Sequence, residues 1–548
     1  MQKVLTAAEM CEVDRLTTEK YGIPTIILME NAAHAVAEVI TEKLGGSVKG
    51  KSVVILCGKG NNGGDGAALA RILELRGAFV DTVLLGKIKE TKGDARINFG
   101  VLCREDFEFD DVYFSNFGEL REMVSKKEWE TFYGERGQFA DVVVDAVFGT
   151  GLTRPLDVWV GNIVHELNFF KEDTRRSALY VAIDLPSGLN ADSSTPLSEP
   201  FNSDVTVTFT APKPANVLPG TVSFNGELVV RDIGSPPDLI ADQPSRLYLV
   251  ERSDAADWLD RTKFSSSSYK NQRGHAMLIA GSENYSGAAV LCGNAAIRSG
   301  VGLVTIGTPR SSKDSTAARV VPEVMVRPLA ETDGGAVSEE AIAEVDGFLE
   351  NVDAIAIGSG LSAKDESTGR FVRHFVENRR VPTVLDADAL TLLSPFDGGA
   401  SKGASKPPLI LTPHQGEFLK LLGTDDKEAI KDRVDMVRKF AQMHNVILVL
   451  KGERVLIGEP GGKVVVNPTG NSGLGKAGNG DTLTGIIAGF AAQAAAMNVD
   501  MFETVVAAVY VAGLAGDIAE EKFGKRVMTA SHVRDCLVEA FETVERAQ

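Results

Sequence analysis

The sequence predicts two three-layer α/β domains on one chain. Its 548 residues are too many for one hydrophobic core, so at least two domains are expected. In both halves short β-branched runs alternate with helical patterns, which is typical of parallel sheets covered by helices. Two glycine-rich stretches, 58–66 and 469–490, each lie next to a predicted helix. They are the places where an α/β fold usually binds an anionic ligand.

Composition restricts the class of partner. The net charge of −18 and the pI near 5.0 argue against nucleic acid or an anionic membrane as the main partner. The cysteines are odd in number and scattered, at Cys11, Cys57, Cys103, Cys292 and Cys536. We expect reduced thiols in a cytoplasmic protein. The histidines form no His-x-x-x-His pair, so we do not expect a zinc site. The N-terminus lacks the apolar core of a signal peptide.

The first glycine-rich stretch is preceded by a strand and followed by a helix. The predicted strand 51–57 leads into GKGNNGGDG at 58–66, and AALARILELRG follows with helical periodicity. Gly58, Gly60 and Gly63 fit the dinucleotide fingerprint G-x-G-x-x-G. Two asparagines and Asp65 also crowd this loop, and no clean acidic residue ends the next strand. The pattern therefore predicts a Rossmann-like domain whose loop binds a nucleotide or anion. The alternative is a loop that serves only tight packing.

Polar residues follow several other strands of the first half. Asp145 lies in VVVDAVFG, Asp184 and Ser187 in AIDLPSG, and Lys213 in TFTAPKP. The carboxyl ends of parallel strands meet at one edge of a sheet. Asn62, Asp145 and Ser187 offer hard oxygen ligands for an alkali or alkaline-earth cation. Asp184 and Lys213 remain as acid–base candidates; the alternatives are strand-end caps and a solvated lysine.

These motifs together resemble the NAD(P)H-hydrate epimerase domain. YGIPTIILMENAA, GKGNNGGDG, VDAVFGTGLTRP, AIDLPSG and TFTAPKP occur in the family's order within residues 1–234. The resemblance implies interconversion of the two epimers of hydrated NAD(P)H, catalysis by Asp184, and a K⁺ site at Asn62, Asp145 and Ser187. It implies substrate contacts at Asn61, Asn62, Gly63, Gly64, Asp65, Gly149, Thr150, Gly151, Leu152, Thr153, Arg154, Pro155 and Asp184.

A proline-rich polar segment separates the two halves, so we expect a linker at 235–250 and a second domain at 251–548. In that second domain too, polar residues follow the predicted strands. They are Asp386, Asp388, His414, Glu417 and Lys451. A single histidine is usually structural, but its position among the other strand ends favours ligand contact for His414. Lys451 fits either a phosphate clamp or a surface lysine.

The stretch 469–490, TGNSGLGKAGNGDTLTGIIAGF, combines glycines with a carboxylate at the start of a predicted helix. Glycines let the backbone turn its N–H groups toward an anion, and a helix N-terminus adds positive potential. A carboxylate in a phosphate site is explained if Asp481 is a general base that takes a hydroxyl proton. The alternative is that Asp481 is only a helix N-cap.

YSGAAVL, GSGL, LDADAL, LTPHQGE, LKG and GNSGLGKAGNGDTLTGIIAG resemble the NAD(P)H-hydrate dehydratase, a ribokinase-like domain. Gln415, Ser359 and Ser472 stand where proline is common in that family, which leaves loop rigidity and affinity open. The resemblance implies hydrate contacts at Ala288, Gly360, His414 and the catalytic Asp481. It implies nucleotide contacts at Lys451, Gly452, Glu453, Arg454, Val455 and Gly480.

The whole chain thus resembles fused NAD(P)H-hydrate repair enzymes. That resemblance implies epimerisation of NADHX and NADPHX, and dehydration of the S epimer with ADP and Mg²⁺ to give AMP and phosphate. We expect a homo-oligomer acting on small molecules. The alternative is a kinase for a vitamin-precursor alcohol in the C-terminal half, joined to a non-catalytic nucleotide-binding module.

Overall fold

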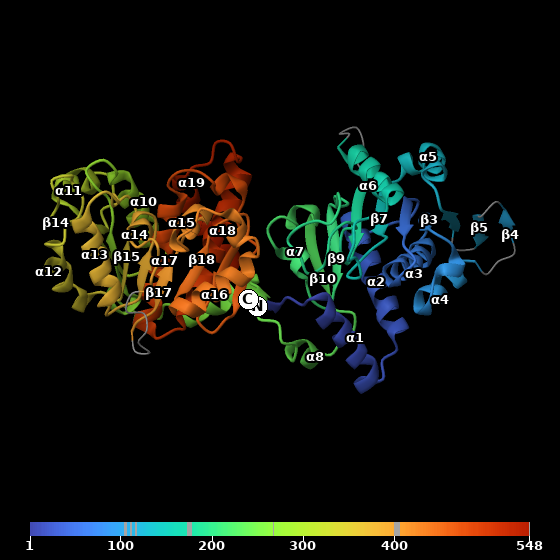
Figure 1. Cartoon of the computed structure of the whole chain (residues 1–548), viewed down its shortest axis with the longest axis horizontal. Helices are drawn as coiled ribbons and strands as arrows, with labels where there is room; N and C mark the ends of the chain where they lie inside the picture. Colours follow the sequence, from blue (N-terminus) through green and yellow to red (C-terminus); the bar gives the residue numbers. More distant parts are fainter. Residues whose placement is uncertain are drawn as a thin grey trace. The chain divides into compact units, whose positions relative to one another are not determined.

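A computed structural model describes residues 1–103, 107–109, 112–115, 118–172, 178–266, 268–398 and 406–546. The chain forms two compact units, Gln2–Ser245 and Arg246–Gln548, with Met1 joining the latter (Figure 1). The boundary falls inside the expected linker, but that segment is structured. Its first part forms helix α8 (Pro237–Ala241), and its last part forms strand β11 (Leu247–Leu249), which pairs with β20 (Val464–Asn467).

The first unit is built on a mainly parallel sheet with the order β10-β9-β8-β7-β2-β3-β6-β5-β4. Among the residues described, only β5 runs opposite to the other strands of this sheet, and it pairs antiparallel with both β4 and β6. The strands of this sheet are β2 (Ser52–Cys57), β3 (Phe79–Leu85), β4 (Phe107–Phe109), β5 (Val112–Ser115), β6 (Gly118–Met123), β7 (Val142–Ala146), β8 (Leu179–Ile183), β9 (Val205–Phe209) and β10 (Glu227–Arg231). The short strand β1 (Gln2–Lys3) is not part of this sheet. The helices of the unit are α1 (Ala7–Tyr21), α2 (Thr25–Lys43), α3 (Asn61–Leu75), α4 (Gly93–Leu102), α5 (Lys126–Glu135), α6 (Val158–Lys171), α7 (Pro214–Val217) and α8.

Alternate residues of one strand in this sheet enter two different hydrophobic clusters. Val53 and Ile55 of β2 pack with the residues of α2 and α3, whereas Val54 and Leu56 pack with those of α5 and α6. Since successive side chains of a strand point to opposite faces, helices cover both faces of the sheet. The predicted three-layer architecture is confirmed.

Helix α3 begins six residues earlier than the sequence pattern suggested, at Asn61 instead of Ala67. Asn61–Asp65, expected in the loop, form its first turn and a half, and Gly60 is the N-cap. The glycines allow this because the helix packs very closely on the sheet. A Cβ on Gly63 would lie 1.8 Å from the carbonyl oxygen of Gly58, which no side chain can tolerate.

The second unit has the strand order β11-β20-β19-β18-β17-β16-β15-β12-β13-β14, parallel apart from β19. Besides β11 and β20, its strands are β12 (His275–Ile279), β13 (Leu303–Pro309), β14 (Val324–Leu329), β15 (Ala354–Ile357), β16 (Thr383–Leu385), β17 (Leu409–Leu411), β18 (Ile447–Leu450) and β19 (Val455–Gly458). Its helices are α9 (Arg252–Arg261), α10 (Ser286–Arg298), α11 (Arg310–Ala317), α12 (Ala341–Asp346), α13 (Glu366–Glu377), α14 (Asp388–Leu392), α15 (Gln415–Leu421), α16 (Arg433–His444), α17 (Asn479–Met497), α18 (Met501–Phe523), α19 (Ala530–Asp535) and α20 (Leu537–Glu545).

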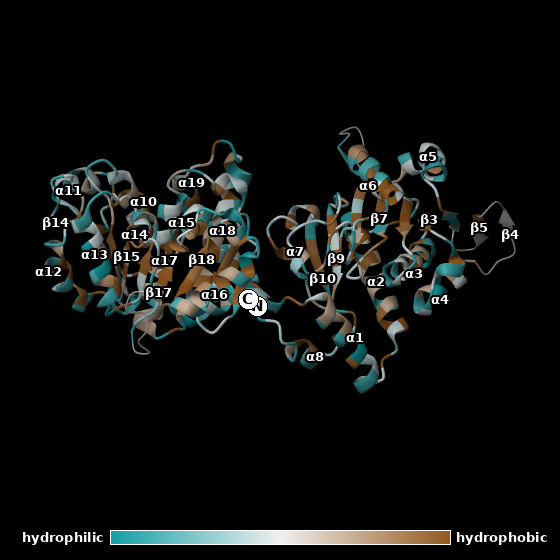
Figure 2. Ribbon diagram, viewed as in Figure 1, coloured by the Kyte–Doolittle hydropathy of each residue, from teal (hydrophilic) through white to brown (hydrophobic). Residues whose placement is uncertain are grey.

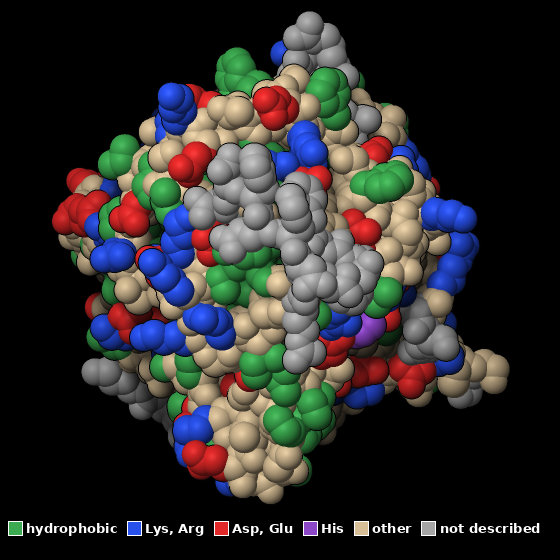
Figure 3. Space-filling model, turned by 90° about the vertical axis from the view of Figure 1, so that its right-hand side faces the viewer, with side chains coloured by type: hydrophobic (Ala, Val, Ile, Leu, Met, Phe, Trp, Pro, Cys, Tyr) green, Lys and Arg blue, Asp and Glu red, His purple; other side chains and the backbone are tan. Residues whose placement is uncertain are grey.

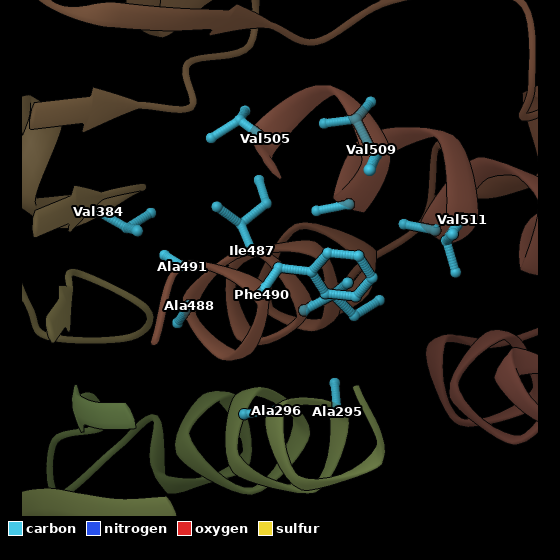
Figure 4. Close-up of a cluster of buried hydrophobic side chains, with 14 of the residues drawn as sticks. Ala295, Ala296, Val384, Ile487, Ala488, Phe490, Ala491, Val505, Val509 and Val511 are labelled. Atoms are coloured by element: carbon cyan, nitrogen blue, oxygen red, sulfur yellow. The ribbon is translucent and has the colours of Figure 1, made fainter. Parts of the chain in front are cut away.

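Helix α17 lies at the centre of this unit's core. Its side chains face α10, α18 and the sheet (Figure 4). Phe490 stacks on Trp258 of α9 with ring centroids 4.3 Å apart. Gly485 lets α10 approach, because a Cβ there would lie 2.1 Å from the carbonyl oxygen of Cys292. The packing fixes the helix, and therefore fixes the position of its N-terminus.

Hydropathy follows the same layers, with apolar strands inside and more polar helix surfaces outside (Figure 2). Helix α18 is long and apolar enough to cross a membrane, but 72% of its apolar window is buried within the protein, as in a core helix of a globular protein. On the face drawn in Figure 3, basic side chains are interspersed with acidic ones. The net charge of −18 is therefore not separated into one acidic area on that face.

Two candidate active sites

The first site lies where the strand order of the first unit changes direction. Strand β3, the next strand along the chain, lies on one side of β2, and β7, which comes later in the sequence, lies on the other side. Ligands of open α/β sheets bind at such a switch point, outside the carboxyl ends of the strands. The segment that follows β2 touches the end of β7 at this point, since the Gly58 amide donates to the Ala146 carbonyl at 3.0 Å. A Cβ on Gly58 would lie 2.0 Å from the Val147 carbonyl oxygen, so only glycine fits.

Asp184 is held at this edge by a buried lysine. Lys213 is 1% exposed, and its Nζ lies 2.6 Å from Asp184 Oδ1. Thr208 donates to the same oxygen at 3.0 Å. The expected contact between Asp184 and Lys213 is confirmed, and the alternative of a solvated lysine is wrong. Lysine is retained in the core because Asp184, Thr208 and the Phe209 carbonyl satisfy its ammonium group.

The other oxygen of Asp184 faces two of the predicted substrate segments. A Cβ placed on Gly149 would lie 3.0 Å from Asp184 Oδ2 and 3.3 Å from Asn62 Oδ1. Three residues from separate parts of the chain therefore meet at one point. In the segment that follows β7, Leu152 is buried and its carbonyl accepts from Asn190 at 3.0 Å. Gly151, Thr153, Arg154 and Pro155 are exposed; their contact with substrate stays a prediction.

Replacing Gly149 by alanine is expected to lower the rate of epimerisation at least about tenfold. The added methyl group would crowd Asp184 Oδ2 at 3.0 Å, and small displacements of a reacting group carry large rate costs. Steady-state epimerisation rates measure the effect. Gly161→Ala in α6 is the matched control, since a Cβ there also meets nothing within 4 Å and the residue is not among the predicted substrate contacts. Equal rates for the two variants would contradict this geometry.

Two of the three predicted K⁺ ligands are in direct contact. The Asp145 carboxylate accepts the amide and hydroxyl of Ser187, both at 2.7 Å, and the amide of Val147 at 3.1 Å. Burial raises the pKa of Asp145 to about 6, against the effect of these hydrogen bonds. Within the described ranges no lysine or arginine pairs with this carboxylate. Asn62, the third, is buried, and its Nδ2 has no hydrogen-bond partner there.

The structure adds an acidic residue that the sequence analysis missed. Asp14 of α1 interacts electrostatically with Lys213 and Asp184, and burial raises its pKa to about 6. Burial also raises the pKa of Asp65 well above its usual range, with Asp184 and Asp14 adding to the effect. No motif surrounds Asp14 in the sequence. It follows an ordinary amphipathic pattern, and only the folded helix brings it to this site.

The second site gathers around Asp386, which follows β16 and is 1% exposed. Lys451 Nζ lies 2.8 Å from its Oδ1, and Thr412 donates to the same atom at 2.8 Å. Thr484 of α17 donates to Oδ2 at 2.9 Å. Burial lowers the pKa of Lys451, but Asp386 and Glu417 outweigh that effect and raise it overall. Lys451 is therefore a fixed cation at the strand ends and not a surface lysine.

Asp481 lies in the first turn of α17, whose N-cap is Gly478 with φ of +89°. The alternative that Asp481 is an N-cap is therefore wrong. A Cβ on Gly480 would lie 3.6 Å from Lys451 Nζ and 3.8 Å from Asp386 Oδ2, so the helix N-terminus opens beside the fixed cation. Burial, with a contribution from Asp386, raises the pKa of Asp481 to about 6. A carboxyl group with this pKa is well suited to act as a base near neutral pH.

The structural role that is usual for a single histidine is confirmed for His414. This residue is the N-cap of α15, and its Nδ1 accepts from the amides of Gly416 and Glu417 at 3.0 and 3.2 Å. Glu417 completes a capping box by accepting the His414 amide at 2.8 Å. The His414 side chain is largely exposed, with Nε2 3.4 Å from Glu417 Oε1, and its contact with the hydrate stays a prediction.

The other predicted contacts of the second site lie on neighbouring connections. Gly360 has φ of +65°, and a Cβ there would lie 2.7 Å from the Cβ of Ala288. The turn between β18 and β19 carries Lys451, Gly452, Glu453 and Arg454, and Val455 is the first residue of β19. Arg454 donates to the Pro468 carbonyl, which ties this turn to the glycine-rich segment.

Asp517 of α18 also supports this site, although no sequence motif marks it. It accepts the Gly470 amide at 2.9 Å and the Asn471 amide group at 3.0 Å, so it fixes the segment before the glycine-rich turn. The described parts of the chain contain no group of three or more His, Cys, Asp or Glu residues arranged to hold a metal. A preformed protein cage for Mg²⁺ is therefore absent from them.

Taken together, these features define an enzyme with two α/β sites, the second suited to phosphoryl transfer. A family model described as NAD(P)H-hydrate dehydratase matches residues 276–538, and one described as YjeF-related protein N-terminus matches residues 25–215. The bifunctional NAD(P)H-hydrate repair enzyme of Moorella thermoacetica is 37% identical over 99% of this chain and 97% of its own. The one from Thermofilum pendens is 33% identical over the same shares.

The chain belongs to the family of bifunctional NAD(P)H-hydrate repair enzymes. It combines an NAD(P)H-hydrate epimerase with an NAD(P)H-hydrate dehydratase. The C-terminal half also matches a Bacillus subtilis structure described as an ADP/ATP-dependent NAD(P)H-hydrate dehydratase co-crystallised with ATP/Mg²⁺. That match has 30% identity and a TM-score of 0.47 over 54% of this chain and 99% of the other.

Proposed function

We propose that Asp481 is the base of the dehydratase and that the second unit uses ADP as its phosphoryl donor. The observation that carries this proposal is the position of Asp481 in the first turn of α17, beside Lys451 and Asp386. First-turn amides of a helix have no partners within the helix and attract phosphate. Asp481 and the phosphate site therefore adjoin.

In this mechanism Asp481 takes the proton of the ring hydroxyl as that oxygen attacks the terminal phosphorus of ADP. The phosphorus–oxygen bond to AMP breaks, and the N-terminal amides of α17 and Lys451 stabilise the developing charge. The phosphorylated hydroxyl then leaves as phosphate, with the electron pair of the ring nitrogen forming the new double bond. Loss of the neighbouring ring proton restores the dihydronicotinamide.

Mg²⁺ fits this site as a companion of the nucleotide. It usually binds one or two carboxylates together with phosphates and water, which agrees with the missing three-ligand cage among the described residues. Asp386 and Asp481 are the carboxylates beside the expected phosphates. Bound there, Mg²⁺ would neutralise phosphate charge.

The choice of donor is tested with purified chain, the S hydrate, Mg²⁺ and either ADP or ATP. We expect recovery of the dihydronicotinamide absorbance with ADP, and one AMP for each hydrate consumed. Recovery with ATP but not ADP would contradict the donor assignment and leave the role of Asp481 intact. A stable phosphorylated alcohol as the end product would instead favour the kinase alternative.

We also propose that Asn62, Asp145 and Ser187 bind K⁺ in the epimerase site. Asp145 is a buried carboxylate that no basic side chain of the described residues neutralises, and the three residues offer amide, carboxylate and hydroxyl oxygens. A cation would compensate the buried charge. The cytoplasmic location and the homo-oligomer likewise stay predictions.

Replacing K⁺ by choline at constant ionic strength is expected to slow epimerisation. Asp145→Asn is expected to raise the half-saturating K⁺ concentration at least about tenfold, because losing only 1.4 kcal/mol of binding has that effect. Asp141→Asn, a nearby carboxylate that pairs with Lys51, is the control. Epimerisation that is independent of K⁺ in the parent chain would contradict the site.

A further inference from the structure

We propose that Asp14 is a second catalytic proton-transfer group of the epimerase site, working with Asp184 on the two faces of the hydrated ring. The proposal rests on the assignment of epimerisation to the first unit and on Asp184 as one of its catalytic groups. It adds a role for helix α1, which lies outside the family match that begins at residue 25.

Epimerisation of the hydrate requires two proton-transfer groups. Inverting the carbon that carries the hydroxyl requires its carbon–oxygen bond to break on one face and to form on the other. The leaving hydroxyl needs a proton donor, and the incoming water needs a proton acceptor. A single carboxylate held as rigidly as Asp184, by Lys213 and Thr208, serves one of these positions.

Packing places α1 over the two connections that carry Asp184 and Lys213. The Leu5 amide donates to the Pro212 carbonyl at 3.0 Å, directly beside Lys213 in the chain. Met10 and Val13 of α1 share a hydrophobic cluster with Ala211. At the start of α1, the Ala7 amide donates to the Asp192 carboxylate at 2.7 Å, and Asp192 belongs to the connection that follows Asp184.

The surroundings of Asp14 are those of a functional carboxyl group and not of a structural one. Its Oδ1 is buried and has no hydrogen-bond partner among the described residues. Leaving a buried carboxyl oxygen unpaired destabilises a protein. A structural aspartate at a helix would instead cap amides or pair with a cation, as Asp192 and Asp184 do. The charged and titratable groups that interact with it are Lys213, Asp184, Asp65 and Cys11.

The proton balance of the reaction closes with these two groups. Protonated Asp14 gives its proton to the hydroxyl, the carbon–oxygen bond breaks, and water leaves while the ring nitrogen donates its electron pair to form a carbon–nitrogen double bond. The Asp184 carboxylate then takes a proton from a water that adds to the same carbon on the other face, and the electron pair returns to nitrogen. One proton has moved from Asp14 to Asp184; Asp184 then releases a proton to solvent and Asp14 takes one up, which restores both groups for the next turnover.

The test follows conversion of the purified R hydrate to the S hydrate by chromatography in the full-length chain, without nucleotide, so that the dehydratase is idle. Asp14→Asn is expected to lower kcat by about 10²- to 10⁴-fold, with KM within about threefold of the parent value. Asp14→Glu keeps the carboxyl group and is expected to recover at least about tenfold over the asparagine variant. Glu12→Gln is the matched control, because Glu12 lies on the same helix and pairs with Arg15 at the surface.

Three outcomes would overturn the role of Asp14. They are an Asp14→Asn rate within about twofold of the parent, a loss of rate that comes entirely from KM, and equal losses in the asparagine and glutamate variants. The last would show a structural role, including the case in which both variants unfold. A parent chain that fails to interconvert the epimers would instead contradict the epimerase assignment itself, so the two failures are distinguishable.

Discussion

Replacing Asp481 by asparagine is expected to lower the dehydratase kcat by about 10²- to 10⁴-fold and to leave epimerisation unchanged. Asparagine has nearly the same shape but cannot accept the hydroxyl proton, and a positioned general base contributes that factor. Since burial raises the pKa of Asp481 to about 6, the parent rate should rise as the pH increases through 6 and then level off. The asparagine variant should lack this inflection. Initial rates on the S hydrate between pH 5 and pH 8 measure both effects.

Asp500→Asn is the matched control for this prediction. Asp500 is the N-cap of the neighbouring helix α18, where its carboxylate accepts the Glu503 amide at 2.9 Å. Asparagine caps helices about as well as aspartate, so this variant should keep the parent rate. A fast Asp481→Asn enzyme with an unchanged pH profile would remove Asp481 from the chemistry.

Replacing Asp184 by asparagine is expected to have the second large effect, on the rate of epimerisation. Asp184 has φ of +64°, a backbone conformation that asparagine tolerates and alanine does not. The change removes the catalytic carboxylate, so epimerisation should fall by about 10²- to 10⁴-fold while dehydration of the S hydrate continues. It also leaves Lys213 buried without its anion, which should destabilise the first unit by about 3–5 kcal/mol. Rates should therefore be measured well below the unfolding transition of the variant, with circular dichroism as the check.

Glu199→Gln serves as its control. Glu199 lies on the same connection after β8, is exposed, and pairs with His165 at 2.9 Å. Its loss should change neither the rate nor the unfolding transition appreciably. Undiminished epimerisation in a folded Asp184→Asn chain would exclude Asp184 as a catalytic group.

Sequence periodicity predicted most of the fold because both domains follow simple local rules. Strand 51–57 was expected from its β-branched residues, and β2 covers Ser52–Cys57. The break at Tyr21–Pro24 separates α1 from α2, where Gly22 adopts φ of +70° and Pro24 is the next N-cap. Polar residues after strands also predicted the positions of Asp386 and Lys451, since parallel strands end at one edge.

Tertiary packing determined what the sequence could not show. Helix α3 starts at Asn61 because Gly63 packs against the Gly58 backbone, an effect that outweighs the low helix propensity of glycine. Asp14 and Asp517 carry no motif and lie on helices with ordinary amphipathic patterns. The former approaches Asp184 only after α1 packs on the connection after β9, and the latter reaches Gly470 only after α18 enters the core.

The central claim is that one chain repairs both epimers through two separate sites. It is tested most directly by giving the purified chain an equilibrium mixture of R and S hydrates with Mg²⁺ and excess ADP, and in parallel ATP, and following dihydronicotinamide absorbance to completion. We predict full recovery in the parent chain, rapid recovery limited to the S fraction with Asp184→Asn, and almost none with Asp481→Asn. A parent chain that stops at the S fraction, or recovers nothing with either nucleotide, would contradict the account.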